Sequence, residues 1–260
     1  MGTALVTGAT SGLGEEFCWQ LARAGHDVIL VARRENLLHD LALKLHEHAG
    51  VRTQVIVADL TDPKDLARVA QRLTLTERSH DINYQPVDLL VNNAGHGLGR
   101  AFVSNDLECE TRALDLMVHA VMVLSYHATR QMIQRGHGAI VNVSSVASET
   151  GAGTYSAHKA WVKAFTEGLS MELSGTGVSA TCVMPGPTRT AFFENAGVAV
   201  HDLPSWAWSH PQSVVSQTLA AVRRGRVLVT PDPLNKVLMG AMRLAPRWVT
   251  RAVVKNIPHM

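Results

Sequence analysis

Seven short apolar runs rich in β-branched residues recur along the 260-residue chain, at residues 3–8, 27–32, 52–58, 87–93, 138–144, 178–184 and 226–230. Continuous apolar runs of this kind are typical of strands buried on both faces of a parallel sheet. The segments between them have helical spacing and are long enough for crossover connections, near residues 12–24, 34–49, 62–79, 106–135 and 154–174. The alternation predicts a doubly wound α/β fold, with a parallel sheet of about seven strands flanked by helices.

Length and composition limit the classes of protein further. A chain of 260 residues with 46% hydrophobic and 18% charged residues fits a single folded domain over residues 1–260. Cys18, Cys109 and Cys182 are odd in number and widely spaced, which predicts neither a disulfide framework nor a metal site. The first apolar run begins at Thr3, and no run reaches the roughly 18 residues of a membrane span. We therefore expect a cytoplasmic protein without a signal peptide or a bound metal.

The formal net charge of +2 is unevenly distributed. Residues 233–260 contain five basic residues and no acidic ones, which leaves 19 basic and 22 acidic residues in residues 1–232. The main body is therefore not expected to bind nucleic acid. In the C-terminal segment Arg243, Arg247, Arg251 and Lys255 are spaced four residues apart, and such a basic amphipathic segment can lie on an anionic membrane surface. The alternative is that residues 233–260 pack over a substrate pocket or against a second subunit.

A glycine-rich turn follows the first apolar run directly and precedes a helical segment. It reads T-G-A-T-S-G-L-G and carries Gly8, Gly12 and Gly14, with Ser11 and Leu13 between them. Glycines allow a tight turn and a close approach of backbone N–H groups to a ligand, and a helix N-terminus favours negative charge. The turn therefore predicts a site for the pyrophosphate of a dinucleotide, although a purely structural turn would use similar residues.

Six motifs together resemble those of the short-chain dehydrogenase/reductase family, in the family's order and at compatible spacing. They are the glycine-rich turn, A-D-L at 58–60, N-N-A-G at 92–95, V-S-S at 143–145, Y-S-A-H-K at 155–159 and P-G-P-T-R-T at 185–190. The glycine spacing resembles the family's compact oxidoreductase branch, which implies a Rossmann fold and a homo-dimer or homo-tetramer. The resemblance also implies cofactor contacts from Asp59, Leu60, Asn92, Ala94, Gly95, Pro185, Gly186, Thr188 and Thr190.

Tyr155 and Lys159 are four residues apart, so on a helix they share one face. A neighbouring ammonium favours the phenolate and lowers the pKa of a tyrosine, which would let Tyr155 exchange a proton with a carbonyl or alcohol oxygen. The resemblance implies that Lys159 also binds the nicotinamide ribose. It further implies that Ser145, the second serine of V-S-S, donates to the substrate oxygen. The alternative for Tyr155 and Lys159 is an exposed pair on a surface helix.

Two further segments bear on the ligands. The second apolar run ends in V-A-R-R, and the guanidinium groups of Arg33 and Arg34 suit a 2′-phosphate, so NADP is expected rather than NAD. Residues 190–212 occupy the region of the family's substrate lid, and their aromatic residues would make it apolar or simply pack a core. These aromatic residues are Phe192, Phe193, Trp206 and Trp208.

The sequence therefore predicts an NADP-dependent oxidoreductase that interconverts a carbonyl and a secondary alcohol on a hydrophobic small molecule. A non-catalytic NADP(H)-binding module for redox sensing or protein interaction is the alternative, although such a module has no need of a proton donor. Relatives usually carry an asparagine about 26 to 28 residues before the working serine, where it helps hold a water beside the lysine. This chain reads M-V-H there, so we expect His119 to replace it in a proton relay or to fill space.

Overall fold

The computed structural model describes residues 2–77, 79–197 and 205–246, together with residues 248, 250 and 252. Within these residues seven parallel strands form one sheet in the order β3-β2-β1-β4-β5-β6-β7. The strands are β1 (Thr3–Thr7), β2 (Asp27–Ala32), β3 (Thr53–Val57), β4 (Leu89–Asn92), β5 (Gly138–Val143), β6 (Val178–Val183) and β7 (Leu228–Val229). The predicted doubly wound sheet is confirmed. Its order reverses between β1 and β4, where such sheets open a crevice at the carboxyl ends of the strands.

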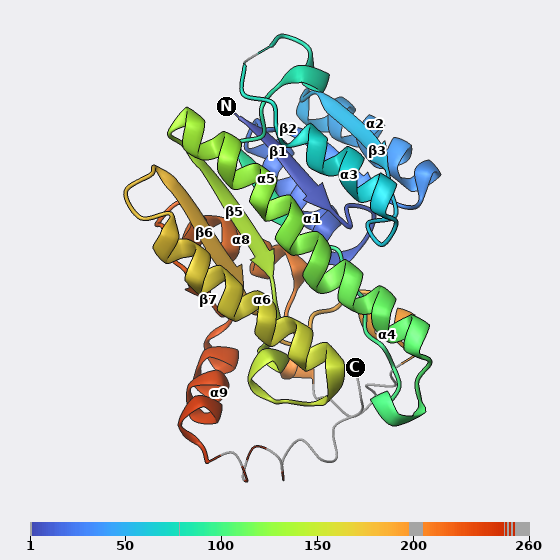
Figure 1. Cartoon of the computed structure of the whole chain (residues 1–260), viewed down its shortest axis with the longest axis vertical. Coiled ribbons are helices and arrows are strands. Elements are labelled where there is room, and N and C mark those ends of the chain that lie inside the picture. Colours follow the sequence, from blue (N-terminus) through green and yellow to red (C-terminus); the bar gives the residue numbers. More distant parts are fainter. Residues whose placement is uncertain are drawn as a thin grey trace.

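Helices cover both faces of this sheet (Figure 1). One face carries α1 (Gly12–Arg23), α2 (Glu35–Ala49) and α8 (Pro211–Val222). The other carries α3 (Pro63–Arg72), α5 (Ala120–Arg135) and α6 (Gly153–Glu172). The helix α4 (Leu107–Leu114) continues through a π-helical turn, η3 (Asp115–His119), into α5. Shorter elements are η1 (Ile82–Tyr84), η2 (Phe102–Ser104), η4 (Val146–Glu149), α7 (Phe192–Asn195) and η5 (Ser205–Ala207), and α9 (Pro233–Leu244) follows β7.

The strands build two cores because their side chains alternate between the faces. In β1, Ala4 and Val6 join the core formed with α1, α2 and α8, whereas Leu5 joins the core formed with α3 and α5. All three residues are fully buried. This burial on both faces explains the continuous apolar runs in the sequence. No helix among the described residues is long and apolar enough to cross a bilayer.

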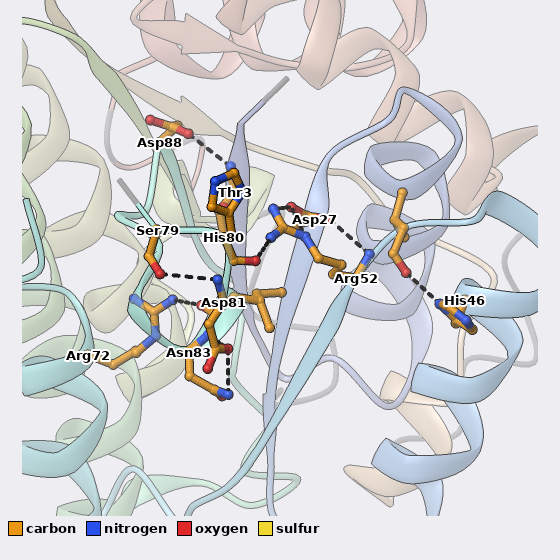
Figure 2. A network of polar contacts seen from close by, with 12 residues as sticks. Thr3, Asp27, His46, Arg52, Arg72, Ser79, His80, Asp81, Asn83 and Asp88 are labelled. Carbon is orange, nitrogen blue, oxygen red and sulfur yellow. Dashed lines mark hydrogen bonds and ion pairs between the residues drawn. The ribbon is translucent and has the colours of Figure 1, made fainter. Parts of the chain in front are cut away.

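The amino ends of the strands are joined by a polar network (Figure 2). Arg52, just before β3, pairs with Asp27 at the start of β2 and also donates to the main-chain oxygen of His80. Asp88, just before β4, accepts a hydrogen bond of 2.9 Å from the backbone N–H of Thr3. These contacts fix the order of the strands at the edge of the sheet opposite the crevice.

Candidate active site

A cavity lies at the carboxyl ends of the strands, where the sheet order reverses. It collects residues from the glycine-rich turn, the segment after β4, the end of β5, the start of α6 and the segment after β6. The predicted site residues that line it are Gly8, Ser11, Gly12, Leu13, Ala94, Gly95, Ser145, Tyr155, Lys159, Pro185, Gly186, Thr188 and Thr190. These thirteen residues come from five segments that are far apart in the sequence and meet at this cavity.

The glycine-rich turn is too tight for side chains. Gly8 has a φ of +67°, and a Cβ on Gly14 would lie 2.1 Å from the main-chain oxygen of Gly8. Ser11 begins α1 but makes no side-chain capping bond to the first helical N–H groups. A helix N-terminus with such groups next to a bare backbone turn is suited to the pyrophosphate of a dinucleotide. The residues present therefore fit a dinucleotide cofactor.

Asn93 holds this turn in place, and the sequence analysis did not assign it a role. Its Nδ2 donates to the main-chain oxygen of Thr7 at 3.0 Å, and Thr7 Oγ1 accepts from the backbone N–H groups of Asn93 and Ala94, also at 3.0 Å. Asn92 points elsewhere: its buried Nδ2 donates to Ser125 Oγ at 3.1 Å and to Asn142 Oδ1 at 2.9 Å. Side-chain direction alternates along the strand, so the second asparagine reaches the cavity and the first joins α5 to β5.

The geometry favours Ser145 over Ser144 as the serine that meets a substrate. Ser144 is buried, and its hydroxyl donates to the main-chain oxygen of Lys159 at 2.6 Å. Ser145 Oγ accepts from the backbone N–H of Ala147 at 3.1 Å and interacts with the hydroxyl of Tyr155. A hydroxyl that already accepts a bond keeps its proton available for an oxygen in the cavity.

Tyr155 is only 5% exposed and packs in an apolar cluster with Ala113, Met117 and Ala147. It is therefore not the exposed surface residue of the alternative interpretation. Burial raises the pKa of Tyr155 well above its ordinary value, and its hydrogen bond with Ser145 opposes that rise. The depressed pKa expected from the sequence is thus not a property of the protein alone, because burial outweighs the stabilisation of the phenolate. In this state Tyr155 is a proton donor.

Lys159 lies one helical turn after Tyr155, with its Nζ 5.7 Å from the centre of the tyrosine ring. Nζ donates to the main-chain oxygen of Val143 at 2.8 Å, and the side chain is 5% exposed. Burial lowers the pKa of Lys159 to about 8. The ammonium is thus directed to the bottom of the cavity, beside Gly95.

A row of aromatic side chains leads from Tyr155 to the surface. The ring of Phe192 in α7 lies 5.8 Å from that of Tyr155, and Phe193 meets Phe192 edge to face at 5.5 Å. Trp208 continues the row at 5.4 Å from Phe193. This agrees with an apolar wall in the segment 190–212, while the side chain of Trp206 lies outside the described residues. The sequence did not show that the ring of Phe192 lies against that of Tyr155.

Arg33 and Arg34 are both exposed at the carboxyl end of β2. Arg34 donates to the main-chain oxygen of Thr10 at 3.1 Å and to its hydroxyl at 3.0 Å, which ties it to the glycine-rich turn. Arg33 lies near Asp59, whose pKa burial raises, whereas hydrogen bonds from Thr61 and the charge of Arg33 lower it, and the net shift is downward. Only Arg34 is thus tied directly to the turn that borders the cavity.

Seven predicted residues lie outside the cavity lining, which are Gly14, Arg33, Arg34, Asp59, Leu60, Asn92 and His119. Leu60 is 5% exposed and packs in the core formed with α3, and Asp59 pairs with Arg112 at 3.1 Å. His119 is exposed and faces a groove beside α3 with Pro63 and Leu66. This placement contradicts a relay through His119. Residues two apart in a helix point to nearly opposite faces, so Met117 packs in the buried cluster of Tyr155 and His119 faces away from it.

Met117 stands where the sequence analysis sought a polar residue. It is fully buried, and a Cβ on Gly95 would be 3.5 Å from both Met117 Sδ and Lys159 Nζ. A thioether is a weak acceptor and cannot donate. His96, the next residue after Gly95, also lines the cavity and was not predicted. Among the described residues no group of three or more His, Cys, Asp or Glu side chains could hold a metal ion.

Comparison with known proteins agrees with this arrangement. Residues 2–199 match the family described as short chain dehydrogenase. Sulfoacetaldehyde reductase 2 of Chromohalobacter salexigens is 36% identical over 193 residues, which cover 72% of this chain and 73% of that protein. The chain belongs to the short-chain dehydrogenase/reductase family, as its motifs predicted.

Two solved structures extend the similarity beyond the matched residues. A short-chain dehydrogenase from Sphingobium yanoikuyae in complex with NADPH is 33% identical with a TM-score of 0.81, covering 95% of this chain and 97% of that one. A bulky-bulky ketone specific alcohol dehydrogenase from Comamonas testosteroni is 31% identical with a TM-score of 0.77, covering 95% and 96%. The fold of almost the whole chain is therefore shared with oxidoreductases of this family.

Proposed function

We propose that the protein is an NADP-dependent oxidoreductase that interconverts a carbonyl and a secondary alcohol. The observation that carries this proposal is the cavity in which Tyr155, Lys159 and Ser145 converge beside the glycine-rich turn. A protein that only bound a dinucleotide would need the turn, but it would have no use for a buried phenol facing an ammonium. That difference favours the enzyme over the redox-sensing or interaction module.

In this proposal the three residues have distinct tasks. The cofactor, when bound, supplies or accepts the hydride. Ser145 donates a hydrogen bond to the substrate oxygen and stabilises the negative charge that develops there. Tyr155 gives that oxygen its proton in the reductive direction and takes it back in the oxidative one. Lys159 supplies the positive charge that stabilises the phenolate left on Tyr155, and it binds the ribose of the cofactor.

NADP is proposed over NAD because Arg33 and Arg34 end β2. An acidic residue there would bind a ribose 2′-hydroxyl and repel a 2′-phosphate, whereas two guanidinium groups offer charge-assisted donors to that phosphate. Arg34 is already placed against the turn through Thr10. The Sphingobium neighbour was solved with NADPH, which supports the same choice.

The substrate is proposed to be a hydrophobic carbonyl compound or secondary alcohol. Phe192 and Phe193 form an apolar wall over Tyr155, and such walls bind the body of a ligand while a few polar groups orient it. The Comamonas neighbour is named for bulky ketones, in agreement with a roomy apolar site. The segment 190–212 would then act as the substrate lid.

The test is NADPH consumption with a panel of aldehydes, ketones and quinones, together with a direct titration of NADPH and NADH binding. The proposal expects oxidation of NADPH by at least one hydrophobic ketone or aldehyde and tighter binding of NADPH than of NADH. Tight NADPH binding without oxidation by any member of the panel would favour the non-catalytic module. Absence of binding would contradict both.

A homo-oligomer is proposed as the assembled form. The helix α5 exposes Met122, Tyr126 and Ile133, with exposed fractions of 43%, 54% and 45%. Large apolar side chains on one helix are suited to contact with a second copy. Light scattering after size exclusion should give a dimer or tetramer, and a charge introduced by Tyr126→Glu should shift it toward the monomer. A monomeric parent protein would contradict the proposal.

Peripheral membrane contact through residues 233–260 is the second partner proposal, within a protein of the cytoplasm. Met239 and Asn235 on the inner side of α9 are buried, with Met239 packed against Met184 and Cys182. Val237, Leu244 and Trp248 are 72%, 89% and 71% exposed. An apolar outer side in a segment with five basic and no acidic residues fits an anionic bilayer.

Co-sedimentation with vesicles of acidic and of neutral lipid tests this contact. Binding to acidic vesicles should fall in the Leu244→Glu/Trp248→Glu variant, while NADPH binding stays unchanged. Equal binding of parent and variant would contradict the membrane proposal. Loss of a dimer in the variant, without any binding of the parent to vesicles, would assign the same surface to a second subunit.

A further inference from the structure

Two buried ionisable side chains near Lys159 have no task in the mechanism above. Glu110 in α4 is 6% exposed and His158 in α6 is 8% exposed. Glu110 Oε1 accepts from Asn105 Nδ2 at 2.8 Å, but Glu110 Oε2 and His158 Nδ1 are buried atoms without a hydrogen-bond partner. Buried polar atoms are almost always paired with protein or with ordered water. Two unpaired atoms on two helices in contact therefore indicate water between them.

The helix positions bring these groups to the catalytic residues. In α4, Glu110 lies one turn before Ala113, which packs in the cluster of Tyr155. In α6, His158 lies three residues after Tyr155 and one before Lys159. Residues three apart share a helix face, so Glu110 shares a face of α4 with Ala113 and His158 shares a face of α6 with Tyr155, and the two helices are in contact.

The charged groups around His158 come from three elements. Burial lowers the pKa of His158, the carboxyl group of Glu110 raises it, and the charges of Lys159 and His96 lower it further. His96 belongs to the segment after β4 and lines the cavity. The charges of Lys159 and of the Glu110 carboxylate thus act on His158 in opposite directions.

Two of the groups around Lys159 cannot pass a proton. Nζ donates to a main-chain oxygen, and the residue on η3 that faces it is Met117. Neither group can accept and release a proton at neutral pH. An imidazole can do both with its two nitrogens.

We propose that His158 and Glu110, bridged by water, form a proton path between Lys159 and solvent at the start of α4. This inference rests on the proposed function of Tyr155 and Lys159. In the reductive direction Tyr155 loses its proton to the substrate oxygen and recovers one from Lys159. Lys159 is then reprotonated by His158, and His158 by solvent through Glu110, so one proton enters for each one transferred. His158 and Glu110 act through Lys159 and are positioning residues.

The electrostatic interaction between His158 and Glu110 can be tested without an activity assay. Imidazole NMR signals of His158 would be assigned by their loss in His158→Asn and followed with pH in the parent and in Glu110→Gln. Removal of the carboxylate charge should lower the pH midpoint of His158 by at least about 0.5 unit, because the imidazolium loses its stabilising neighbour. An equal midpoint in both proteins would overturn the pair, whether or not the protein reduces a substrate.

Activity measurements on the same variants then test the proton path from solvent to Lys159. With NADPH and a carbonyl substrate, His158→Asn and Glu110→Gln should lower kcat by about tenfold and increase its solvent isotope effect, because proton supply becomes limiting. KM and NADPH affinity should remain within about twofold. The matched control is His119→Asn, which replaces an exposed histidine on the opposite side and should behave as the parent. An active parent whose kcat and isotope effect survive in His158→Asn would overturn the path. An inactive parent would overturn the proposed function and the path with it, but not the pair.

Discussion

The two ends of the parallel sheet use charged residues in opposite ways. At the amino ends, Arg52 pairs with Asp27, and Asp88 accepts from Thr3 (Figure 2). Asp88 also pairs with Arg135. At the carboxyl ends, the ammonium of Lys159 is buried against a neutral main-chain oxygen. The first arrangement joins strands and helices, whereas the second keeps a charge ready for a ligand.

This difference shows which end of the sheet carries the features that destabilise the fold. A buried charge without a carboxylate partner destabilises the folded state, and a turn that leaves no room for a Cβ at Gly8 and Gly14 restricts the sequence there. Both features occur at the end of the sheet that carries the cavity. Ion pairs and strand contacts at the other end add stability without touching the site. Changes at the two ends should therefore have separable effects on activity and stability.

The largest effect is expected at the carboxyl end from Tyr155→Phe. Loss of the hydroxyl removes the proton donor, and turnover should fall by about 10²–10⁴-fold, the range typical of a general acid. NADPH affinity and the unfolding midpoint should stay close to the parent values, because the ring and its contact with Phe192 remain. Retained turnover would exclude Tyr155 from the mechanism.

At the amino end, Asp88→Asn should reduce stability strongly. Arg135 is only 8% exposed at its side chain, so removal of the Asp88 charge leaves a buried guanidinium without its ion-pair partner. We expect the free energy of unfolding to fall by about 3 kcal/mol, measured by denaturant titration. Turnover of the folded fraction should change by less than about twofold, because distant sites act independently. A matching loss of turnover would show that the two ends are coupled.

A smaller, pH-dependent gain in stability is expected from Lys159→Met. Burial lowers the pKa of Lys159 from 10.5 to about 8, so below pH 8 the folded state bears the full cost of a buried ammonium. That cost is about 3 kcal/mol at most by linkage, so the variant should unfold at higher denaturant near pH 6. Between about pH 8 and 10.5 the folded parent loses this proton while the unfolded chain keeps it, so the parent recovers stability and the gap closes. A gap that does not change with pH would contradict a buried charged Lys159.

The smallest effect is expected in the affinity for the cofactor. Replacement of Arg33 and Arg34 by Ser should weaken NADPH binding about ten- to a hundredfold, the equivalent of one charge-assisted contact, and leave NADH binding nearly unchanged. Fluorescence titration with both cofactors measures the difference. Equal losses for NADPH and NADH would instead mean that Arg34 acts by holding Thr10 in the turn.

The sequence predicted the sheet well because its strands are buried on both faces and read as continuous apolar runs. β7 was expected over residues 226–230 and spans only Leu228–Val229, where the strand pairs with β6 alone at the sheet edge. The long segment 106–135 was predicted as one helix, and it contains the π-helical turn of η3. A local pattern cannot show that turn, because it depends on packing against α6.

The site was predictable where a motif fixes the backbone, as at Gly8, Gly14 and Tyr155. It was less predictable where side-chain direction decides the role. Asn92 and Asn93 are neighbours with the same chemistry, yet only Asn93 lines the cavity. His119 was expected beside the lysine, but Met117 lies there, because residues two apart in a helix point to nearly opposite faces. Glu110 belongs to none of the motifs, and His158 occupies an unassigned position of Y-S-A-H-K, so only burial in the folded chain distinguishes them.

Paired measurement of Asp88→Asn and Tyr155→Phe tests the separation of the two ends most directly. Each variant would be assayed for its free energy of unfolding and for NADPH turnover with one substrate. The account predicts that Asp88→Asn loses stability and keeps turnover, while Tyr155→Phe loses turnover and keeps stability. A variant that loses both properties together, or a Tyr155→Phe protein that still turns over substrate, would contradict it.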